Sequence, residues 1–285
     1  MPAPLLAVDA PSMLYRAFFA LPKSITDGAG RSVNALLGTA NLILREVEEH
    51  APRAVVLCFG PDAAIYRVEL FAGYHARRPE MPADLAPQFE EAPGFFASFG
   101  WEIADHDSLE ADDLLGSLAR VEAEAGGTTL LLTGDRDMFQ CANERTTILY
   151  VRTGRKGAEL VDPEEVRRRY GVPPELVADF IALRGDPSDG IPGAKGVGEK
   201  TAAELLSRHG SLDGVLDGAL AESTPRLRGT LREGREQLLA FREIARLQDA
   251  GVNRPPDRET DLAMAAEAAR ERGMERLAKR LAPGS

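Results

Sequence analysis

The chain has 285 residues, of which 44% are hydrophobic and 28% are charged, with both signs mixed along the sequence. This composition predicts a globular protein with a sizeable core and excludes an intrinsically disordered chain. The formal net charge of −11 by itself counts against a nucleic-acid partner, because phosphate groups usually call for a basic surface.

The N-terminus lacks the basic region and the long apolar run of a signal peptide, and no apolar stretch approaches membrane-spanning length. The two cysteines, Cys58 and Cys141, have no metal-ligand spacing and are too few for a disulfide framework. We therefore expect a protein of the reducing cytoplasm that has no membrane partner.

Three short apolar runs predict buried strands, at residues 5–8, 53–59 and 128–132. The first run ends at Asp9, and the other two are followed closely by Asp62 and Asp135. Residues 36–47 follow helical spacing after Asn34, a plausible N-cap. Strands that alternate with helices predict an α/β fold with a mostly parallel sheet, and functional sites gather at the carboxyl edge of such sheets.

The stretch at residues 75–100 differs in composition, because arginines and prolines precede a helical run from Phe89 to Phe99. We interpret it as a segment that projects from the sheet. After about Tyr150 the pattern becomes largely helical, with turns rich in glycine and proline, which predicts a second, α-helical region. Residues 260–281 have the pattern of an amphipathic helix.

Three acidic groups stand out beyond Asp9. They are Glu110, Asp112 and Asp113 after Ser108, a candidate N-cap; Asp135 and Asp137; and Asp186 and Asp189 in a loop flanked by glycines. Any one group is commonly a helix cap or a turn. As a set, several fall at strand ends on one sheet edge, where repulsion would raise their pKa values unless a divalent cation relieves it. Oxygen-only ligands suit Mg²⁺ or Mn²⁺ better than Zn²⁺, and two such ions can activate a water against a phosphodiester.

Residues 191–201 form a glycine-rich stretch that contains Gly193, Lys195, Gly196, Gly198, Lys200 and Thr201. A nucleotide-binding P-loop fits poorly, because Glu199 interrupts the motif and no buried strand precedes it. A hairpin between helices at residues 177–183 and 201–208 fits better. Its glycines and lysines would hold a nucleic-acid backbone without reading sequence, although a tight helix connection without a ligand stays open.

These motifs resemble those of the 5′-nuclease (flap endonuclease) family, in particular the 5′→3′ exonuclease domain of bacterial DNA polymerase I in its stand-alone actinobacterial form. The matching segments are Val8-Asp9 with Leu14-Tyr15-Arg16-Ala17-Phe18, Glu110-Ala111-Asp112-Asp113, Thr133-Gly134-Asp135-Arg136-Asp137, and residues 185–193 followed by Gly196-Val197-Gly198. Each segment is short, but their combination and order are highly specific, and the similarity covers nearly the whole chain.

The resemblance implies a PIN-like nuclease domain at residues 1–170, with a helical arch at about 75–100. It implies a helical DNA-binding region at 171–285 that contains a helix–three-turn–helix module at about 174–209. The implied reaction is hydrolysis of DNA at 5′ ends, flaps or nicks to a 5′-phosphate and a 3′-hydroxyl, in replication and repair. We expect a monomer, and we expect no polymerase to follow because the chain ends at Ser285.

The resemblance also implies the roles of individual residues. Two or more Mg²⁺ or Mn²⁺ ions would be held by Asp9, Glu110, Asp112, Asp113, Asp135, Asp137, Asp186 and Asp189. Arg78, Asp112 and Asp135 would be catalytic, with Arg78 against the scissile phosphate. DNA would be bound by Arg16, Tyr74, His75, Arg78, Gly193, Lys195, Gly196, Gly198, Lys200 and Thr201, with a K⁺ ion possible at the hairpin.

Two positions depart from the family pattern. An acid usually follows the phenylalanine at the end of the second strand, and this chain has Gly60 there. Asp62 either reaches the same space or caps the turn. The family usually carries a lysine beside Tyr74, whereas this chain has His75, and a neutral imidazole would weaken that phosphate contact. These departures leave open a structure-specific DNA-binding protein with weakened catalysis. A PIN-type ribonuclease is a third possibility, but such enzymes usually lack the glycine-rich hairpin and the long arch.

Overall fold

The computed structural model describes residues 3–152, 157–221 and 224–282. Its six strands are β1 Leu5–Asp9, β2 Ala54–Cys58, β3 Glu102–Ala104, β4 Thr129–Thr133, β5 Thr146–Val151 and β6 Ala158–Val161. They form one sheet in the order β3-β2-β1-β4-β5-β6, parallel except for the antiparallel pair β5–β6. The predicted α/β fold with a mostly parallel sheet is therefore confirmed.

The α-helices are α1 Ala10–Ala20, α2 Asn34–His50, α3 Ile65–Leu70, α4 Ala86–Ala97, α5 Ala111–Glu124, α6 Pro163–Tyr170, α7 Val177–Arg184, α8 Glu199–His209, α9 Leu212–Asp217, α10 Pro225–Glu233, α11 Arg235–Ala245, α12 Leu262–Glu271 and α13 Glu275–Leu281. Three short 3₁₀ segments are η1 Asp137–Cys141, η2 Pro174–Leu176 and η3 Gly218–Ala221. In the described part of the chain, no helix combines the length and apolar character that crossing a bilayer requires.

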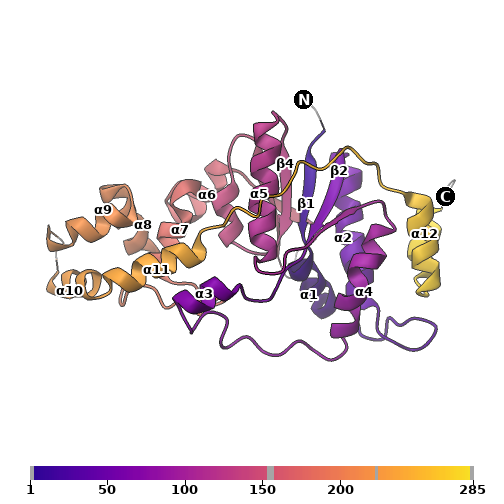
Figure 1. Cartoon of the computed structure of the whole chain (residues 1–285), viewed down its shortest axis with the longest axis horizontal. Coiled ribbons are helices and arrows are strands. Elements are labelled where there is room, and N and C mark those ends of the chain that lie inside the picture. The colour runs from indigo at the N-terminus through magenta and orange to yellow at the C-terminus, as the bar shows by residue number, and fades with distance from the viewer. Residues whose placement is uncertain (1–2, 153–156, 222–223, 283–285) are drawn as a thin grey trace.

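The sheet separates two layers of core, because successive side chains of a strand point to opposite faces. Leu5 and Ala7 pack with α5, α7 and α11 on one face. Leu6 and Val8 pack with α1, α2, α4, α12 and α13 on the other. In Figure 1 the helices α6 to α11 extend to one side of the sheet, and α12 lies at the opposite end. After α11 the chain therefore returns past the sheet, so that α12 and α13 pack on the sheet with α1, α2 and α4.

Three local expectations need correction. Asn34 is the first residue of α2 and not its cap, since Val33 holds that position. Its side-chain amide instead donates to the carbonyls of Phe18 and Leu21, which fixes the end of α1 against the start of α2. The helix expected at residues 260–281 is divided in two at Gly273, which has a positive φ of 69° that favours glycine.

The projecting arch expected at about residues 75–100 is also corrected. The helix in this stretch, α4, packs on the sheet, with Phe95 and Phe96 fully buried, and Gln88 accepts a hydrogen bond from the Ala35 amide at 2.8 Å. Only residues 76–81 are exposed in an unbroken run, and they form turns and loop rather than helix. In Figure 1 this segment lies in the long loop that joins α3 to α4. The aromatic residues of α4 drive it onto the core, which leaves the loop alone to project.

Candidate metal centre and active site

Asp9 is the last residue of β1 and is 4% exposed. One of its carboxylate oxygens accepts from the Ser12 amide at 3.0 Å and so caps α1. The other accepts from the Thr133 hydroxyl at 2.7 Å, at the end of β4. Burial raises the pKa of Asp9. The two parallel strands therefore fix this carboxylate at the carboxyl edge of the sheet.

Asp135 and Asp137 follow β4 at the same edge. The Asp135 amide donates to the Thr133 hydroxyl at 2.9 Å, and the Asp135 carboxylate accepts from the Asp137 amide at 2.8 Å. Burial, and then the charge of Asp189, raises the pKa of Asp135 from 3.8 to about 7. Burial, and then Asp135, raises the pKa of Asp137 well above its ordinary value. These shifts show that acids from separate segments act on one another here.

Asp112 joins this group from the first turn of α5. Burial raises its pKa well above 3.8, and Asp9 and Asp135 raise it further. The same charges act on the thiol of Cys58 at the end of β2. Burial raises the pKa of this thiol well above 9.0, and the charges of Asp9 and Asp112 raise it further. Cys58 therefore stays a protonated thiol, and the donors gathered at this edge are carboxylate oxygens.

Asp186 and Asp189 reach the edge from the loop after α7. Asp186 is 7% exposed, pairs with Arg184 at 2.9 Å and accepts from the Ser188 amide at 2.8 Å. Asp189 is 8% exposed, and both acids raise the pKa values of Asp135 and Asp137. The helical module therefore contributes two acids to the edge of the sheet.

Asp113 does not face the other acids, contrary to its expected role as a metal ligand. It is fully buried, and its two oxygens accept from the Arg67 guanidinium at 2.8 and 3.0 Å. One of them also accepts from the Gln248 amide at 2.8 Å. Asp112 therefore faces the acidic edge, whereas Asp113 points to Arg67.

Glu110 lies between these two environments. It is the N-cap of α5 in a capping box with Asp113, so the candidate N-cap Ser108 is wrong by two residues. Its carboxylate pairs with Arg67 at 3.0 Å and accepts from the Tyr74 hydroxyl at 3.0 Å. Glu110 also raises the pKa of Asp112. Tyr74 and Arg67 thus orient Glu110, and the glutamate remains close enough to act on the acidic edge.

Gly60 has no room for the acid that the family pattern places there. A Cβ at this position would collide with the Leu109 carbonyl and approach the Ala111 amide to 3.1 Å. Asp62 does not fill the space either, because its exposed carboxylate pairs with Arg78 at 3.0 Å. Asp62 was expected to be either a metal ligand or a turn cap. Its carboxylate is instead an ion-pair partner of Arg78.

His75 and Arg78 both reach Asp189. The His75 Nδ1 donates to the Asp62 carbonyl at 2.7 Å, since a carbonyl only accepts, and its Nε2 lies 3.2 Å from the Asp189 carboxylate. The ring stacks on Tyr74 with centroids 3.8 Å apart. Arg78 Nη2 is 3.5 Å from the same carboxylate. The His75 side chain is therefore enclosed as a link between two loops, whereas Arg78, 38% exposed, presents a cation beside the acids.

Arg16 lies on α1 beside the turn after β4. Its guanidinium donates to the Gly134 carbonyl at 2.6 Å, and a Cβ at Gly134 would occupy the space of that guanidinium. Arg16 also lowers the pKa of Asp9, against the larger opposing effect of burial. The glycine between Thr133 and Asp135 therefore makes room for a cation at the acidic edge.

The glycine-rich stretch is a connection between α7 and α8, as predicted, and a helix rather than a strand precedes it. Gly193 and Gly196 have φ values of 66° and 83°, and the Ala194 amide donates to the Leu183 carbonyl at 2.8 Å. Lys195, Gly196, Gly198 and Lys200 are exposed, and Lys200 is 91% exposed at its side chain. The hairpin thus offers backbone amides and two cations to solvent.

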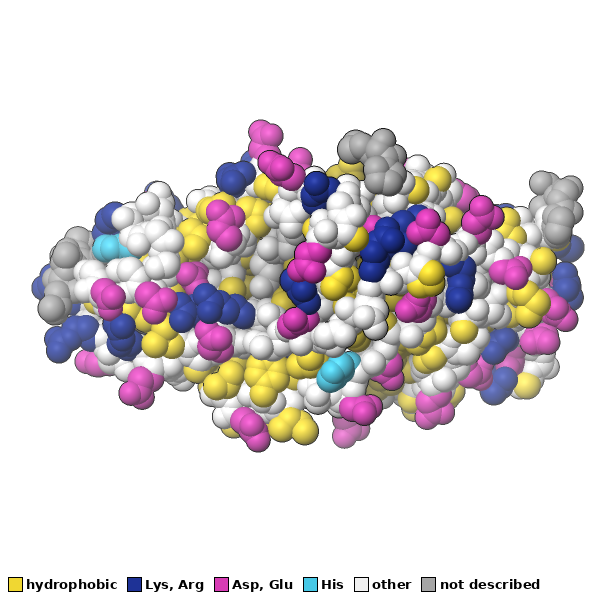
Figure 2. Space-filling model, turned by 45° about the horizontal axis from the view of Figure 1, so that its top comes forward, with side chains coloured by type: hydrophobic (Ala, Val, Ile, Leu, Met, Phe, Trp, Pro, Cys, Tyr) yellow, Lys and Arg dark blue, Asp and Glu magenta, His cyan; other side chains and the backbone are white. Residues whose placement is uncertain are grey.

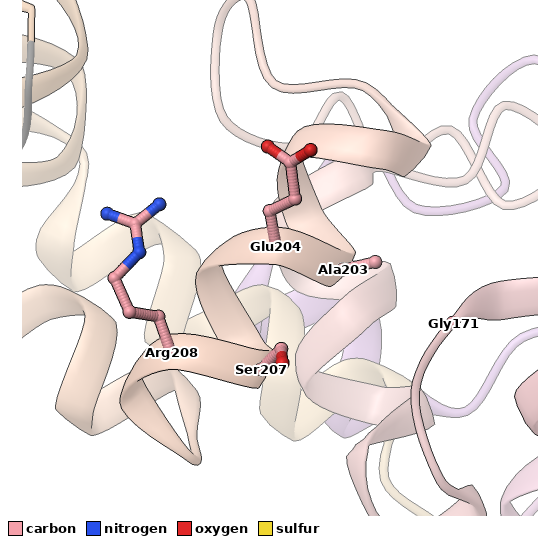
Figure 3. Close-up of a pocket in the computed structure, with 5 residues that line it drawn as sticks. All are labelled: Gly171, Ala203, Glu204, Ser207 and Arg208. Carbon is pink, nitrogen blue, oxygen red and sulfur yellow. The ribbon is translucent and has the colours of Figure 1, made fainter.

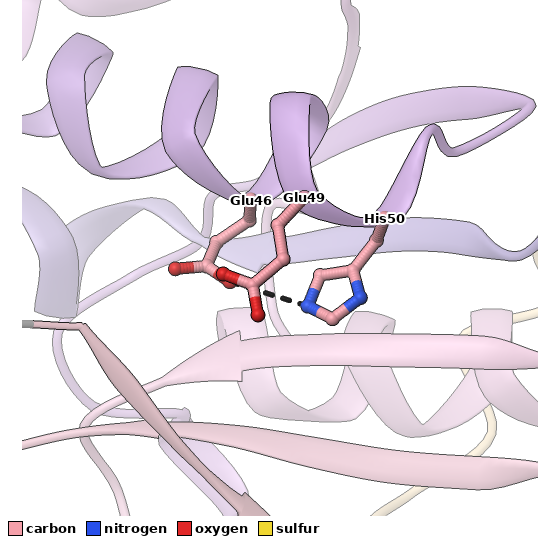
Figure 4. A group of neighbouring side chains, drawn as sticks. All are labelled: Glu46, Glu49 and His50. Atoms are coloured by element: carbon pink, nitrogen blue, oxygen red, sulfur yellow. Dashed lines mark ion pairs between the residues drawn. The ribbon is translucent and has the colours of Figure 1, made fainter.

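The carboxylates of the edge suit a hard divalent cation, because they are buried oxygen donors with raised pKa values. A separate trio at the end of α2, formed by Glu46, Glu49 and His50, has donor atoms within 4.8 Å of one another (Figure 4). In the residues that the structure describes, no trio of the edge acids is that close. The edge acids are therefore spaced more widely than the trio on α2.

The face of the molecule drawn in Figure 2 is mixed in charge. In Figure 2, lysine and arginine side chains are interspersed with aspartate and glutamate over the visible face. One hollow of about 510 Å³ lies between Gly171 and the outer side of α8, where Ala203, Glu204, Ser207 and Arg208 line it (Figure 3). It contains none of the edge acids and is lined by one residue of each charge.

Sequence reasoning missed four residues that support the site. Thr133 bridges Asp9 and Asp135, Arg67 holds Glu110 and Asp113, and Arg184 pairs with Asp186. Ser12 donates its amide to Asp9. Thr133 lies within the quoted motif, which was a usable signal. Arg67 is 43 and 46 residues from its two acids, and Arg184 is two residues from Asp186. Neither spacing distinguishes these arginines from the others in the sequence.

The fold and the acidic edge define an α/β protein of the 5′-nuclease type. The model of the 5′-3′ exonuclease N-terminal resolvase-like domain matches residues 4–171, and that of the 5′-3′ exonuclease C-terminal SAM fold matches residues 172–265. The chain therefore belongs to the 5′-3′ exonuclease family, as the resemblance implied.

Among curated relatives, a 5′-3′ exonuclease of Mycobacterium tuberculosis (strain ATCC 25618 / H37Rv) is 36% identical over an alignment of 272 residues, and the match covers 88% of this chain and 84% of the relative. The DNA polymerase I of Pseudomonas aeruginosa is 38% identical over 254 residues, 86% of this chain but 27% of the relative. The chain thus spans about a quarter of the length of the polymerases that it matches.

Solved structures share the fold at low identity. The T5 5′-exonuclease with bound divalent metal ions (zinc) has a TM-score of 0.71 and 14% identity, and the match covers 97% of this chain and 96% of the other. The catalytic core of Rad2 in complex with DNA substrate has a TM-score of 0.63 and 17% identity, covering 98% and 92%. These likenesses concern the fold alone, and they span both halves of the chain.

Proposed function

We propose that this protein is a divalent-metal-dependent 5′→3′ exonuclease and flap endonuclease that hydrolyses DNA phosphodiesters. The observation that carries the proposal is the convergence of buried carboxylates with raised pKa values, Asp112, Asp135 and Asp137, at one sheet edge. Perturbed acids that act on one another are a mark of functional sites. The metal and DNA ligands of the T5 and Rad2 structures support the same assignment.

The residues that would hold two or more Mg²⁺ or Mn²⁺ ions are Asp9, Glu110, Asp112, Asp135, Asp137, Asp186 and Asp189. Bound there, the ions would lower the pKa of a water and neutralise charge on the scissile phosphate. The protein fixes these acids beforehand: Thr133 orients Asp9, and Arg184 orients Asp186. Such orientation by neighbouring groups is a large part of a metal site's affinity.

Arg78 would contact the scissile phosphate. Its guanidinium lies between the Asp62 and Asp189 carboxylates and is partly exposed. A phosphate placed beside Asp189 competes with Asp62 for the guanidinium, whose planar donors suit a phosphate. Asp62 therefore holds Arg78 near the site and leaves part of its guanidinium accessible to a phosphate.

The hairpin would hold the DNA backbone away from the scissile bond. Exposed amides and the cations Lys195 and Lys200 suit phosphates irrespective of sequence, and a K⁺ ion at this turn belongs to the same proposal. DNA with 5′ ends, flaps or nicks is the proposed substrate, bound by a monomer in the cytoplasm. We further propose that residues 1–170 act as the nuclease domain and that the DNA-binding module lies within residues 171–285.

The experiment is cleavage of a 5′-labelled flap duplex by the purified protein. We expect a cut near the single-strand/duplex junction with Mn²⁺ or Mg²⁺, none with EDTA, and products with a 5′-phosphate. The matched control is Asp112→Asn, which keeps the size of the side chain and removes its charge. A protein that binds the flap but does not cut it, whichever divalent metal is added, contradicts the proposal.

One observation favours a second function, a structure-specific DNA-binding protein with weak catalysis. The space beside Gly60 excludes an acid, so this edge has one carboxylate fewer than the family pattern. Flap binding without cutting is its signature. A PIN-type ribonuclease would instead prefer an RNA flap to a DNA flap of the same sequence.

A further inference from the structure

A second hollow, of about 380 Å³, lies beside the acidic edge. Four arginines line it, Arg136, Arg152, Arg168 and Arg169, and we call it the arginine pocket. It is bordered by the loop after β4, by the end of α6 and by Glu199, the first residue of α8. The pocket therefore lies between the acidic edge and the glycine-rich hairpin, and it contains none of the residues assigned above.

Three of these arginines share two carboxylates. Arg152 and Arg169 pair with Glu159 at 3.4 and 2.8 Å. Arg168 and Arg169 pair with Glu165 at 2.6 and 2.5 Å. Counted with Arg136 and Glu199, four guanidinium groups face three carboxylates, so the pocket keeps one net positive charge after its internal pairing.

Arg136 adds a fourth cation. It is exposed, and its Nε donates to the Tyr150 hydroxyl at 3.1 Å. A phenol is a neutral partner, so Glu199, which also lines the pocket, is the carboxylate that acts on this guanidinium. Arg136 lies between Asp135 and Asp137 in sequence, yet its side chain lines the arginine pocket. The same turn therefore directs acids to the metal edge and a cation to the neighbouring hollow.

Aromatic rings also line the pocket, and two of them hold Arg169 in place. The Arg169 guanidinium lies over the Phe139 and Tyr150 rings, 5.6 and 5.8 Å from their centroids. Tyr170 stacks on Phe180 at 4.9 Å. Guanidinium groups held against aromatic faces lose little freedom on binding, and their planar donors match phosphate oxygens.

We propose that the arginine pocket binds a backbone phosphate of the DNA that occupies the metal centre, at a point between that centre and the hairpin. This inference rests on the proposed function. It follows from charge: two divalent ions would offset only part of the charge of the seven carboxylates at the edge, and a neighbouring positive pocket offsets the remaining repulsion where the strand passes. The pocket would add affinity without reading sequence, because phosphate contacts position DNA and base contacts specify it.

The test is the salt dependence of flap binding, measured by fluorescence anisotropy with Mg²⁺ in an Asp112→Asn background that leaves the DNA intact. Arg136→Gln should weaken binding of all sequences alike. It should also reduce the slope of log affinity against log salt by about 1, the contribution of one phosphate contact. Arg145→Gln is the matched control, because Arg145 is exposed before β5 at the opposite sheet edge, and it should leave the slope unchanged.

Equal slopes for Arg136→Gln and Arg145→Gln would overturn the proposal. So would a loss of Mn²⁺ binding by Arg136→Gln, measured by calorimetry, with an unchanged salt slope, since Arg136 would then serve the metal edge. Arg152→Gln, at the outer rim, gives a second measurement if Arg136→Gln misfolds, and a lower slope is again expected. If the Asp112→Asn protein with an intact pocket does not bind flap DNA at all, the proposed function fails rather than the pocket.

Discussion

Arg67 and Asp113 form a bidentate pair, with nitrogen–oxygen distances of 2.8 and 3.0 Å, and both side chains are at least 97% buried. Arg67 Nε also donates to the Ile244 carbonyl at the end of α11. The pair therefore joins the small helix α3, the acid-bearing helix α5 and the helical half of the molecule at one point.

We expect Arg67→Ala to lower the free energy of unfolding by about 3–5 kcal/mol, because it leaves Asp113 buried without its partner. Urea denaturation followed by circular dichroism measures the change. Arg145→Ala, an exposed arginine, should alter it by no more than about 0.5 kcal/mol. A loss for Arg67→Ala as small as that of the control would show that the pair is not needed for folding.

Asp112 and Asp113 should separate catalysis from stability. Asp112→Asn should lower the cleavage rate by about 100-fold or more with no loss of melting temperature, because it removes a repelling charge from a buried cluster. Asp113→Asn should lower the melting temperature, because it weakens the bond to Arg67. Rate measurements with saturating Mn²⁺ and thermal denaturation test both. If both variants changed the cleavage rate and the melting temperature in the same way, Asp112 and Asp113 would not have separate roles in catalysis and stability.

The stability of the metal-free protein should fall as pH rises through the range in which Asp135 titrates. Its pKa is 3.8 ordinarily and about 7 in the fold. Between these values the folded state holds a proton that the unfolded state has released, so this group stabilises the fold at low pH and loses that effect as pH approaches about 7. In EDTA, the melting temperature of Asp135→Asn minus that of wild type should grow from pH 5 to pH 8.

Mg²⁺ or Mn²⁺ should reverse this trend, because the ion binds the deprotonated carboxylates. The rise in wild-type melting temperature on adding metal should be larger at pH 8 than at pH 5. A difference between Asp135→Asn and wild type that does not change with pH would show that Asp135 titrates normally.

Gly60→Ala should destabilise the protein, although it adds a single methyl group. The methyl group would collide with the Leu109 carbonyl, and the backbone that must move carries Glu110 and Asp112. We expect a loss of about 1–3 kcal/mol, the usual effect of overpacking, together with slower cleavage. Gly28→Ala is the control, since a Cβ there meets nothing within 4 Å. A stable, fully active Gly60→Ala would mean that the loop yields easily.

Asp62→Ala should leave the number of bound Mn²⁺ ions unchanged, because the Asp62 carboxylate pairs with Arg78 rather than facing the acids. Isothermal titration calorimetry counts the ions. Asp189→Ala, which removes an acid that acts on Asp135 and Asp137, should weaken or remove one ion. Loss of an ion from Asp62→Ala would instead restore Asp62 as the substitute for the missing acid.

The periodicity of the sequence was enough to predict the core of the fold. The apolar runs that became β1, β2 and β4 were short but uninterrupted, and each ended near an acid. The strands β3, β5 and β6 were not predicted. β3 and β6 have only three and four residues, which carry no distinct pattern, and β5 was missed although most of its six residues are buried. The position of α4 also went wrong, since its composition indicated a helix but not which surface its aromatic residues would cover.

The candidate site divides in the same way. The sequence by itself determined that carboxylates meet at one edge, because parallel strands end on the same side and Asp9 and Asp135 follow directly from two of them. Only the tertiary structure decided which acids face that edge. Arg67, from a distant helix, takes Asp113 out of the set; the backbone of Leu109 closes the space at Gly60; and Arg78 takes Asp62. Each decision depends on a contact between residues at least 16 positions apart. Spacing along the chain indicates which residues share a face of a helix or strand. It does not indicate which residues of other elements pack against that face.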